Sequence, residues 1–395
     1  MIAQRLVTPG GARCVDNVTM DIDRPTPLLG GLTPQSFMKR YWQKKPLLVR
    51  QAWADVAAPI ARAELFDLAA RDDVESRLIV QRDSDWTLRH GPLERRSLPA
   101  LKQPGWTLLV QGLDLHVEAA HEMLQRFRFV PEARLDDLMI SYATEGGGVG
   151  PHLDSYDVFL LQVHGQRRWR IGRVPDPQWV QGVPLKLLAN FEAEEEWVLE
   201  PGDMLYLPPR WGHDGEAVGE CMTCSIGFRA PAPTELAREL LQHMVDALDP
   251  DGGERLYRDP QQPATDEPGR IPTTLLQFAH AAVTRALDEP GSLECALGEA
   301  LTEPKPLVWF EQGVPVPPGQ GVRLDRRTRM MYDEQHVFIN GESFRGSGRD
   351  AKLMRRLADE RWLDAADVGR LGEGARQLLD EWAMAGWARP LGEAV

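Results

Sequence analysis

Two histidines and one aspartate are spaced so that they can bind one metal ion. His152 and Asp154 are two residues apart, and His213 follows further along the chain. In an extended strand, residues i and i+2 point to the same side, so His152 and Asp154 can face a metal together. Two imidazoles and one carboxylate on one face of a metal leave positions open for a co-substrate and O2, as in the non-haem Fe(II) oxygenases. The pattern therefore predicts an Fe(II) oxygenase site.

The tripeptide His-x-Asp/Glu carries no information by itself. With 9 histidines and 59 acidic residues in 395, chance predicts about 1.3 matches, and the chain has two. The second, at 116–118, falls in a predicted helix, where residues i and i+2 do not share a face, so we expect solvated surface there. The match at His152 has a supporting context. Glycines at 146–150 allow a sharp turn before it, and prolines at 208–209 end the short strand that delivers His213.

A nearby arginine is placed to bind a dicarboxylate co-substrate. Arg167 and Trp169 share one face of a predicted strand, and Arg168 and Arg170 share the other. A guanidinium group beside an iron site is a natural anchor for such a co-substrate, because it binds a carboxylate through two hydrogen bonds. The alternative is that all three arginines face solvent.

Composition limits the classes of function. The chain has 395 residues, too many for one ordinary core, so we expect two or three domains. Its net charge of −14 disfavours direct nucleic-acid binding and suits a basic polypeptide partner. No apolar run approaches the roughly 20 residues of a membrane span, and the first residues lack a secretory signal. We therefore expect a cytoplasmic protein with no membrane partner.

Many short strands at close spacing predict a sandwich or barrel around the site. Turn residues such as His164-Gly165 and Pro201-Gly202 separate them. Helices are predicted at 33–42, 57–70 and 115–128. The predicted strands are 77–81, 106–111, 138–143, 157–163, 167–171, 196–199, 203–207 and 222–228.

Two proline-rich points divide the rest of the chain. After Pro231-Ala-Pro233, helical periodicity with wide apolar faces is predicted at 234–248, 273–287 and 293–301. Such faces must be buried on the barrel or on a second copy of the chain. After Pro304-Lys-Pro306, strands at 321–330 and 336–339 and helices at 350–360, 364–370 and 374–384 fit a winged helix. Residues 304–395 hold 14 Lys/Arg and 14 Asp/Glu, so the basic footprint of a DNA reader is missing.

These motifs together resemble the JmjC-type ribosomal oxygenases, in particular their bacterial branch, the ribosomal protein arginine hydroxylases. The resemblance extends from Met20 nearly to the C-terminus. It rests on the segments 148–154, 156–162, Gly165-x-Arg-x-Trp169 and 201–209 with His213. Many relatives have Lys where this chain has Arg167. Residues 1–19 have no counterpart, and Met20 is an equally good first residue.

The resemblance implies a fold and a division into domains. The fold class is α+β: a JmjC/cupin double-stranded β-helix with a helical dimerisation region and a C-terminal winged helix. The expected parts are a disordered leader (1–19), a JmjC catalytic domain (20–230), a helical dimerisation region (231–303) and a winged-helix domain (304–395). A homodimer is therefore expected.

The resemblance also implies an activity. It predicts an Fe(II)- and 2-oxoglutarate-dependent dioxygenase that hydroxylates Cβ of an arginine in large-subunit ribosomal protein sixteen. The iron ligands would be His152, Asp154 and His213. Arg167 and Ser141 would hold the distal carboxylate of 2-oxoglutarate, although Ser141 also fits an ordinary strand serine.

Three alternatives stay open at this point. The same iron site serves ribosomal histidine hydroxylases and lysine demethylases, and a cupin-like dimeric scaffold without catalysis is the alternative of another class.

For the proposed basic substrate, we expect an acidic group at the mouth of the site, either Glu145 or Asp157.

Overall fold

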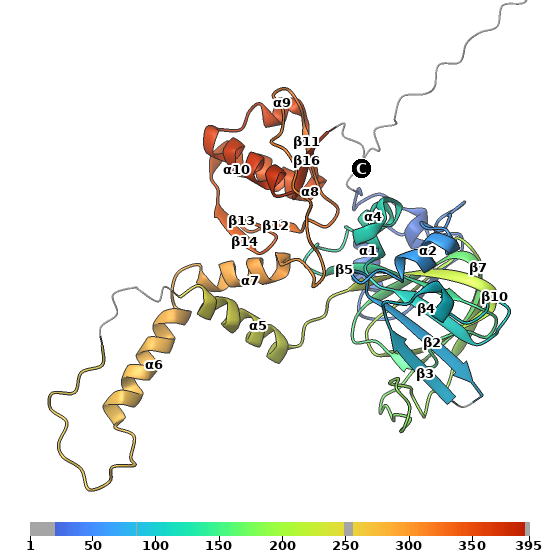
Figure 1. The fold of residues 1–395 in the computed structure, drawn as a ribbon, viewed down its shortest axis with the longest axis horizontal. Helices are drawn as coiled ribbons and strands as arrows, with labels where there is room; N and C mark the ends of the chain where they lie inside the picture. The colour runs from blue at the N-terminus through green and yellow to red at the C-terminus, as the bar shows by residue number, and fades with distance from the viewer. Residues whose placement is uncertain (1–19, 84, 249–255, 392–395) are drawn as a thin grey trace, which may run out of the picture.

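The computed structural model describes residues 20–83, 85–248 and 256–391. The predicted leader at 1–19 lies outside these residues. A curved antiparallel sheet with the N-terminal helices beside it forms the right-hand part of the molecule in Figure 1, and the helices that follow the sheet and a small α/β unit lie to its left. No helix among the described residues has the length and apolar character needed to cross a membrane.

The main sheet has ten strands in the order β1-β9-β7-β10-β5-β4-β2-β3, with β6 paired to β10 and β8 to β7. Every pairing is antiparallel. The strands are β1 (Leu47–Val49), β2 (Ser76–Arg82), β3 (Asp85–His90), β4 (Trp106–Val110), β5 (Leu135–Ala143), β6 (His152–Leu153), β7 (Val158–Arg173), β8 (Glu195–Leu199), β9 (Met204–Leu207) and β10 (Trp211–Phe228).

The two longest strands, β7 and β10, pair along most of their length and hold the fold together. The sequence predicted two strands with a turn at Gly165 where the structure has the single strand β7. Gly165 has φ +61°, and a Cβ there would lie 2.0 Å from the Glu220 carbonyl oxygen, so the strand bends at this glycine without ending. The strand predicted at 222–228 corresponds to the second half of β10, and the first half was not predicted.

The curved sheet has apolar side chains on both faces. Along β7, Phe159 and Leu161 pack into the core that the sheet shares with the N-terminal helices. Val158 and Leu160 point to the inside of the fold, where they join a second cluster that includes Trp169. The helices are η1 (Pro27–Leu29), α1 (Pro34–Arg40), α2 (Arg62–Leu68), η2 (Arg95–Ser97), α3 (Leu113–His116) and α4 (Glu118–Gln125).

The helix predicted at 115–128 is in fact broken. Val117 is extended at φ −127° and separates α3 from α4. His116 and Glu118 therefore lie on different helices. His116 is half-buried, so the expectation of a solvated surface was wrong for this residue.

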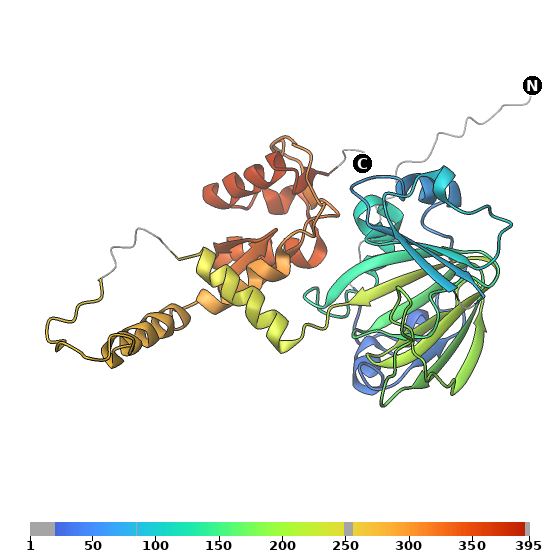
Figure 2. The same cartoon turned by 60° about the horizontal axis from the view of Figure 1, so that its bottom comes forward.

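Three helices follow the sheet: α5 (Pro233–Asp246), α6 (Thr273–Leu287) and α7 (Ser292–Thr302). The first and third pack against each other, whereas α6 extends away from the rest of the described chain (Figure 1, Figure 2). No residue of α6 is buried, although its sequence is rich in leucine and alanine.

The C-terminal unit has its own apolar core, formed by two three-stranded sheets and three helices. The strand predicted at 321–330 was wrong, because the chain turns in the middle and contributes to both sheets. The elements are β11 (Val322–Leu324), β12 (Met330–Tyr332), β13 (His336–Ile339), β14 (Glu342–Arg345), α8 (Gly348–Glu360), β15 (Trp362–Leu363), α9 (Ala365–Val368), α10 (Glu373–Met384) and β16 (Ala388–Pro390).

Arginine side chains connect this unit to the main sheet and its helices. Arg128 donates to the carbonyl oxygens of Asp359 and Ala358 at 2.5 and 2.8 Å. In the opposite direction, Arg326 of the C-terminal unit donates through Nε to the Leu115 carbonyl oxygen of α3 at 2.8 Å. Backbone carbonyl oxygens thus accept the hydrogen bonds that hold the unit in place.

Candidate metal and co-substrate site

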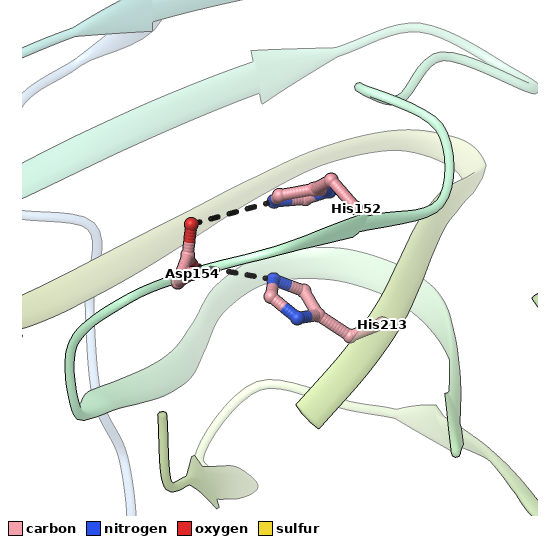
Figure 3. A group of neighbouring side chains, drawn as sticks. All are labelled: His152, Asp154 and His213. Atoms are coloured by element: carbon pink, nitrogen blue, oxygen red, sulfur yellow. Dashed lines mark ion pairs between the residues drawn. The ribbon is translucent and has the colours of Figure 1, made fainter. Parts of the chain in front are cut away.

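Strand pairing brings the two predicted histidine ligands together. Strand β6 pairs with the start of β10, and His152 lies directly opposite His213 in that register. Directly opposed residues of antiparallel strands have neighbouring side chains, and the two imidazole centroids are 4.1 Å apart. Asp154 follows β6 and turns back toward both rings (Figure 3).

The three side chains fit one metal ion. Asp154 Oδ2 lies 3.4 Å from His213 Nε2, and Asp154 Oδ1 lies 4.0 Å from His152 Nε2. One ligand atom from each residue falls within 4.8 Å of the others. Donor atoms about 2.1 Å from a shared ion and on one face of it are separated by about 3 Å, so a small adjustment of these side chains completes the arrangement.

Both imidazoles are fixed in the tautomer that a metal requires. His152 Nδ1 lies 2.8 Å from the Gly150 carbonyl oxygen, and His213 Nδ1 lies 3.0 Å from that of Trp211. An Nδ1–H that donates to a carbonyl leaves the Nε2 lone pair free to bind a metal. Each ring is therefore oriented by the backbone of its own strand.

Burial and mutual contact set the charges of the triad. Burial, together with the nearby His213 ring, lowers the pKa of His152 to about 4. Burial alone would raise the pKa of Asp154, but contact with His213 lowers it to about 2. Burial alone would lower the pKa of His213, but the Asp154 carboxylate outweighs it and raises this pKa. The triad thus offers an ionised carboxylate and a neutral His152 at neutral pH.

Arg167 and Ser141 lie together deeper in the fold. Arg167 is buried on β7, and its Nη1 donates to Ser141 Oγ on β5 at 3.3 Å. Its Nη2 donates to the Gly215 carbonyl oxygen at 3.0 Å. The guanidinium therefore contacts a hydroxyl and a carbonyl, neither of which carries a charge to balance it. Its Nε has no hydrogen-bond partner among the described residues.

The glycine-rich loop before β6 lets the backbone approach neighbouring strands closely. A Cβ at Gly147 would lie 2.4 Å from the Trp106 carbonyl oxygen, and one at Gly148 would lie 2.4 Å from that of Gly215. Only glycine fits at such distances. The loop thus holds His152 against β10.

Some side chains near the site were not identified as functional from the sequence, and one was misplaced. Burial, followed by the nearby Asp154 carboxylate, raises the pKa of the half-exposed Tyr156, which lies beside the triad. Asp157 was expected at the mouth, but it is fully buried and accepts hydrogen bonds from Tyr206 and Gln43 at 2.6 and 3.0 Å. Asp157 therefore stabilises the fold through these hydrogen bonds and does not line the mouth of the site. Glu145, the other acidic group expected there, is exposed.

Two family models match the chain. One describes a JmjC domain and matches residues 122–236, which include the triad and Arg167. The other describes a ROXA-like winged helix and matches residues 285–389.

Curated proteins and solved structures agree with these matches. The chain is 36% identical over 275 residues to the ribosomal protein uL16 3-hydroxylase of Escherichia coli K12, covering 68% of this chain and 70% of the relative. It is 37% identical over 205 residues to a probable ribosomal oxygenase of Haemophilus influenzae, covering 51% and 50% of the two chains.

Solved structures of the E. coli ribosomal oxygenase YcfD resemble most of the chain. One matches with a TM-score of 0.79 and 30% identity, covering 91% of this chain and 98% of that one. Another, of YcfD with cobalt and 2-oxoglutarate, matches with a TM-score of 0.76 and 29% identity over 91% and 99% of the two chains. The predicted combination of a JmjC/cupin fold and a C-terminal winged helix is therefore confirmed.

Proposed function

Because the chain belongs to the JmjC-domain ribosomal oxygenases that carry a ROXA-like winged helix, we propose that it is an Fe(II)- and 2-oxoglutarate-dependent hydroxylase of ribosomal protein uL16. The proposed reaction is hydroxylation of an arginine at Cβ. The observation that carries the proposal is the triad of His152, Asp154 and His213 in the same fold interior as the uncompensated guanidinium of Arg167.

The proposed metal ligands are the Nε2 atoms of His152 and His213 and a carboxylate oxygen of Asp154. Two histidines and one carboxylate with open positions suit Fe(II) in oxygenases. The cobalt complex of YcfD supports metal binding by this fold. When bound, Fe(II) would activate O2 for the oxidation of a C–H bond to C–OH while 2-oxoglutarate is converted to succinate and CO2.

The proposed role of Arg167 and Ser141 is to bind the far carboxylate of 2-oxoglutarate. A buried guanidinium that donates to a hydroxyl and a carbonyl, and whose Nε has no partner among the described residues, has donor capacity left for an anion. The YcfD complex with 2-oxoglutarate supports this co-substrate for the fold. The apolar cluster of Val158, Leu160 and Trp169 lies on the same side of β7 and would exclude water from the co-substrate.

The proposed protein substrate follows from the named relative and from charge. The E. coli relative is a uL16 3-hydroxylase, and a chain with a net charge of −14 suits a basic ribosomal protein. The specific reaction that we propose is hydroxylation of an arginine side chain at Cβ. Histidine hydroxylation and lysine demethylation are the alternatives. A ribosomal substrate places the enzyme in the cytoplasm.

We propose that residues 231–303 form the interface of a homodimer. In the chain they lie between the catalytic part (20–230) and the winged helix (304–395). Apolar side chains of α5 and α6 are exposed in the single chain, and such surfaces usually bind a partner. Self-association is favoured because α6 extends away from its own chain and has no buried residue. The exposed apolar residues include Leu241, Val245, Leu275, Leu276, Phe278, Val283 and Leu287.

The experiment that tests this function measures succinate formed from 2-oxoglutarate with Fe(II) and a uL16 fragment. Wild-type protein should form succinate, and His152→Ala should not, because the triad then has two ligands. His116→Ala is the matched control, since it alters the other His-x-Asp/Glu tripeptide and should keep activity. Equal turnover by His152→Ala, or no turnover by the wild type, would support a non-catalytic scaffold.

A further inference from the structure

The loop between β7 and β8 (residues 174–194) lies against the segment that carries the first proposed metal ligand. Leu188 N donates to the Pro151 carbonyl oxygen at 2.8 Å, and Pro151 directly precedes His152. A Cβ at Gly150 would lie 3.0 Å from a methyl group of this loop, so the loop also packs on the glycine-rich turn. The loop therefore borders the metal site.

Hydrogen bonds hold the two arms of this loop together. Trp179 and Leu188 form an isolated antiparallel bridge. Asn190 donates through Nδ2 to the Asp176 carbonyl oxygen at 2.9 Å and accepts from Gln178 N at 3.0 Å. Leu188 is buried, whereas Trp179 directly opposite it is 40% exposed. The fold thus fixes the backbone of Trp179 and leaves part of its ring in solvent.

An exposed tryptophan on a fixed backbone is suited to binding another polypeptide. The neighbouring Val180 is also exposed, as is Tyr156, two residues after Asp154. Large aromatic side chains supply much contact area with few rotatable bonds, and tryptophan is enriched among the residues that dominate binding energy in protein interfaces. Apolar contact area is therefore available on the loop and beside the triad.

The charge of the loop favours a basic partner. Together with the first residue of β8, the loop contains one cation, Lys186, and the four carboxylates Asp176, Glu192, Glu194 and Glu195. Glu194 pairs with Arg173 at 3.0 Å, whereas the other three carboxylates are exposed and form no ion pair among the described residues. Carboxylates attract lysine and arginine side chains, and the face of a tryptophan ring binds the same cations.

We propose that Trp179 and the three unpaired carboxylates bind the basic polypeptide that surrounds the target arginine of uL16. This inference rests on the proposed function, because it takes uL16 as the substrate. Since the loop is hydrogen-bonded to the residue before His152, it is within reach of a polypeptide whose side chain extends to the metal. Trp179 would hold a lysine or arginine next to the target and take no part in the chemical step.

The first test is the kinetics of Trp179→Ala with a uL16 fragment. We expect the KM for the fragment to rise about tenfold, while kcat at saturating fragment and the KM for 2-oxoglutarate are kept. Trp179→Phe keeps an aromatic face and should recover most of the affinity. Trp309→Ala is the matched control, because Trp309 is 54% exposed in the segment before the winged helix; its KM should equal that of the wild type. An unchanged KM in Trp179→Ala would overturn the inference.

The second test locates the contact by hydroxyl-radical footprinting of the wild-type protein, with Zn²⁺ in place of iron. At saturating uL16 fragment, we expect oxidation of Trp179 to fall several-fold and oxidation of Trp309 to stay the same. Equal oxidation of Trp179 with and without the fragment would show that uL16 lies elsewhere.

The third test concerns the carboxylates and measures the Kd of the fragment for the same Zn²⁺ form. The triple variant Asp176→Asn/Glu192→Gln/Glu195→Gln should bind several-fold more weakly, with a smaller dependence on salt. The control is Glu334→Gln/Glu342→Gln/Glu373→Gln, which removes the same charge from exposed positions of the winged helix and should keep the wild-type Kd. Equal weakening in both variants would mean that net charge, and not this loop, attracts uL16.

The outcomes separate this inference from the function on which it rests. If the wild type hydroxylates uL16 and Trp179→Ala does so with the same KM, the inference fails while the proposed function stands. If the metal-loaded wild type neither binds nor hydroxylates uL16, both fail. A change of molecular mass in solution on Trp179→Ala would assign the exposed ring to a contact between copies of the chain and would also overturn the inference.

Discussion

At the scale of single residues, the site depends on groups whose positions are fixed by the backbone. The Nδ1 atoms of His152 and His213 lie within hydrogen-bonding distance of carbonyls of their own strands, so both Nε2 atoms face Asp154. A metal ion would meet ligands already oriented, which lowers the entropic cost of binding.

Arg167 gives the sharpest prediction at this scale. We expect Arg167→Gln to weaken 2-oxoglutarate binding by about a hundredfold or more, because a charge-assisted pair of hydrogen bonds is worth about 3 kcal/mol in a buried site. The measurement is the Kd for 2-oxoglutarate by calorimetry. Arg168→Gln is the matched control, since Arg168 points to the opposite face of β7, toward Glu196 and Glu216.

A similar loss in both variants would show that the charge of the strand, and not the interior guanidinium, matters. Full binding by Arg167→Gln would remove Arg167 from the proposed co-substrate site.

Residue types and spacing led to part of this site but not all of it. The triad named from the sequence does lie together, because β6 pairs with β10 and sets His152, with Asp154 just after it, beside His213. Arg167 is buried and contacts Ser141, as period-two alternation along β7 indicated. Their roles remain predictions. The close approach of Trp169 and Arg167 to Gly215 was not predictable, because it depends on which strands are neighbours.

At the scale of secondary structure, the register between strands positions the chemistry. Strand β10 carries His213, Gly215 and Ala217 on one face, opposite Ile171, Trp169 and Arg167 of β7. The first half of β10 was missed from the sequence because Gly212, Gly215 and Gly219 are typical of turns. In the structure Gly212 and Gly215 allow close packing instead: a Cβ at Gly212 would lie 2.7 Å from a Val174 methyl.

Helix α3 carries a buried carboxyl group that makes stability depend on pH. Asp114 Oδ1 accepts a hydrogen bond from Leu138 N at 2.8 Å. Burial, followed by the nearby Asp137, raises the pKa of Asp114 to about 7. Because this folded-state pKa is above the unfolded value of about 3.9, the folded state binds the proton more tightly. The stabilisation that this tighter proton binding gives the folded state is complete below about pH 4 and is lost as the pH rises to about 7.

We therefore expect Asp114→Asn to gain stability relative to the wild type as pH rises. Asparagine keeps an oxygen acceptor for Leu138 N and cannot ionise. Between about pH 5 and about pH 8, the difference in unfolding free energy should move in favour of the variant by on the order of 2 kcal/mol. Urea unfolding at both pH values measures this, with the exposed Asp176→Asn as control. A difference that is the same at both pH values would contradict the assignment.

At the scale of the whole molecule, the winged helix is fixed to the catalytic part, while no residue of α6 is buried. Arg128, Arg326 and Lys305 connect the two folded parts through carbonyl and carboxylate oxygens. Wide apolar helix faces in the middle block were predictable from periodicity, whereas their exposure in the single chain was not. Periodicity shows that a face is apolar but not what covers it.

The proposed homodimer gives the prediction at this scale. Wild-type protein should show about twice the chain mass of 44.3 kDa in solution. The double variant Leu276→Glu/Val283→Glu places two charges on one exposed apolar face of α6 and should be monomeric. Gln277→Glu/Thr284→Glu adds the same charge to the neighbouring polar positions and should remain dimeric. Light scattering after size-exclusion chromatography distinguishes the forms, and a monomeric wild type would disprove the proposed interface.

The most direct test of the central claim is the mass of purified uL16 after incubation with this protein, Fe(II), 2-oxoglutarate and isotopically labelled O2. The account predicts a gain of one labelled oxygen atom, located on an arginine by peptide fragmentation, and no gain with His152→Ala. An unmodified uL16 in a reaction where the added protein is folded and metal-loaded would contradict it. Oxygen on a histidine, or loss of a methyl group from lysine, would contradict the proposed arginine specificity.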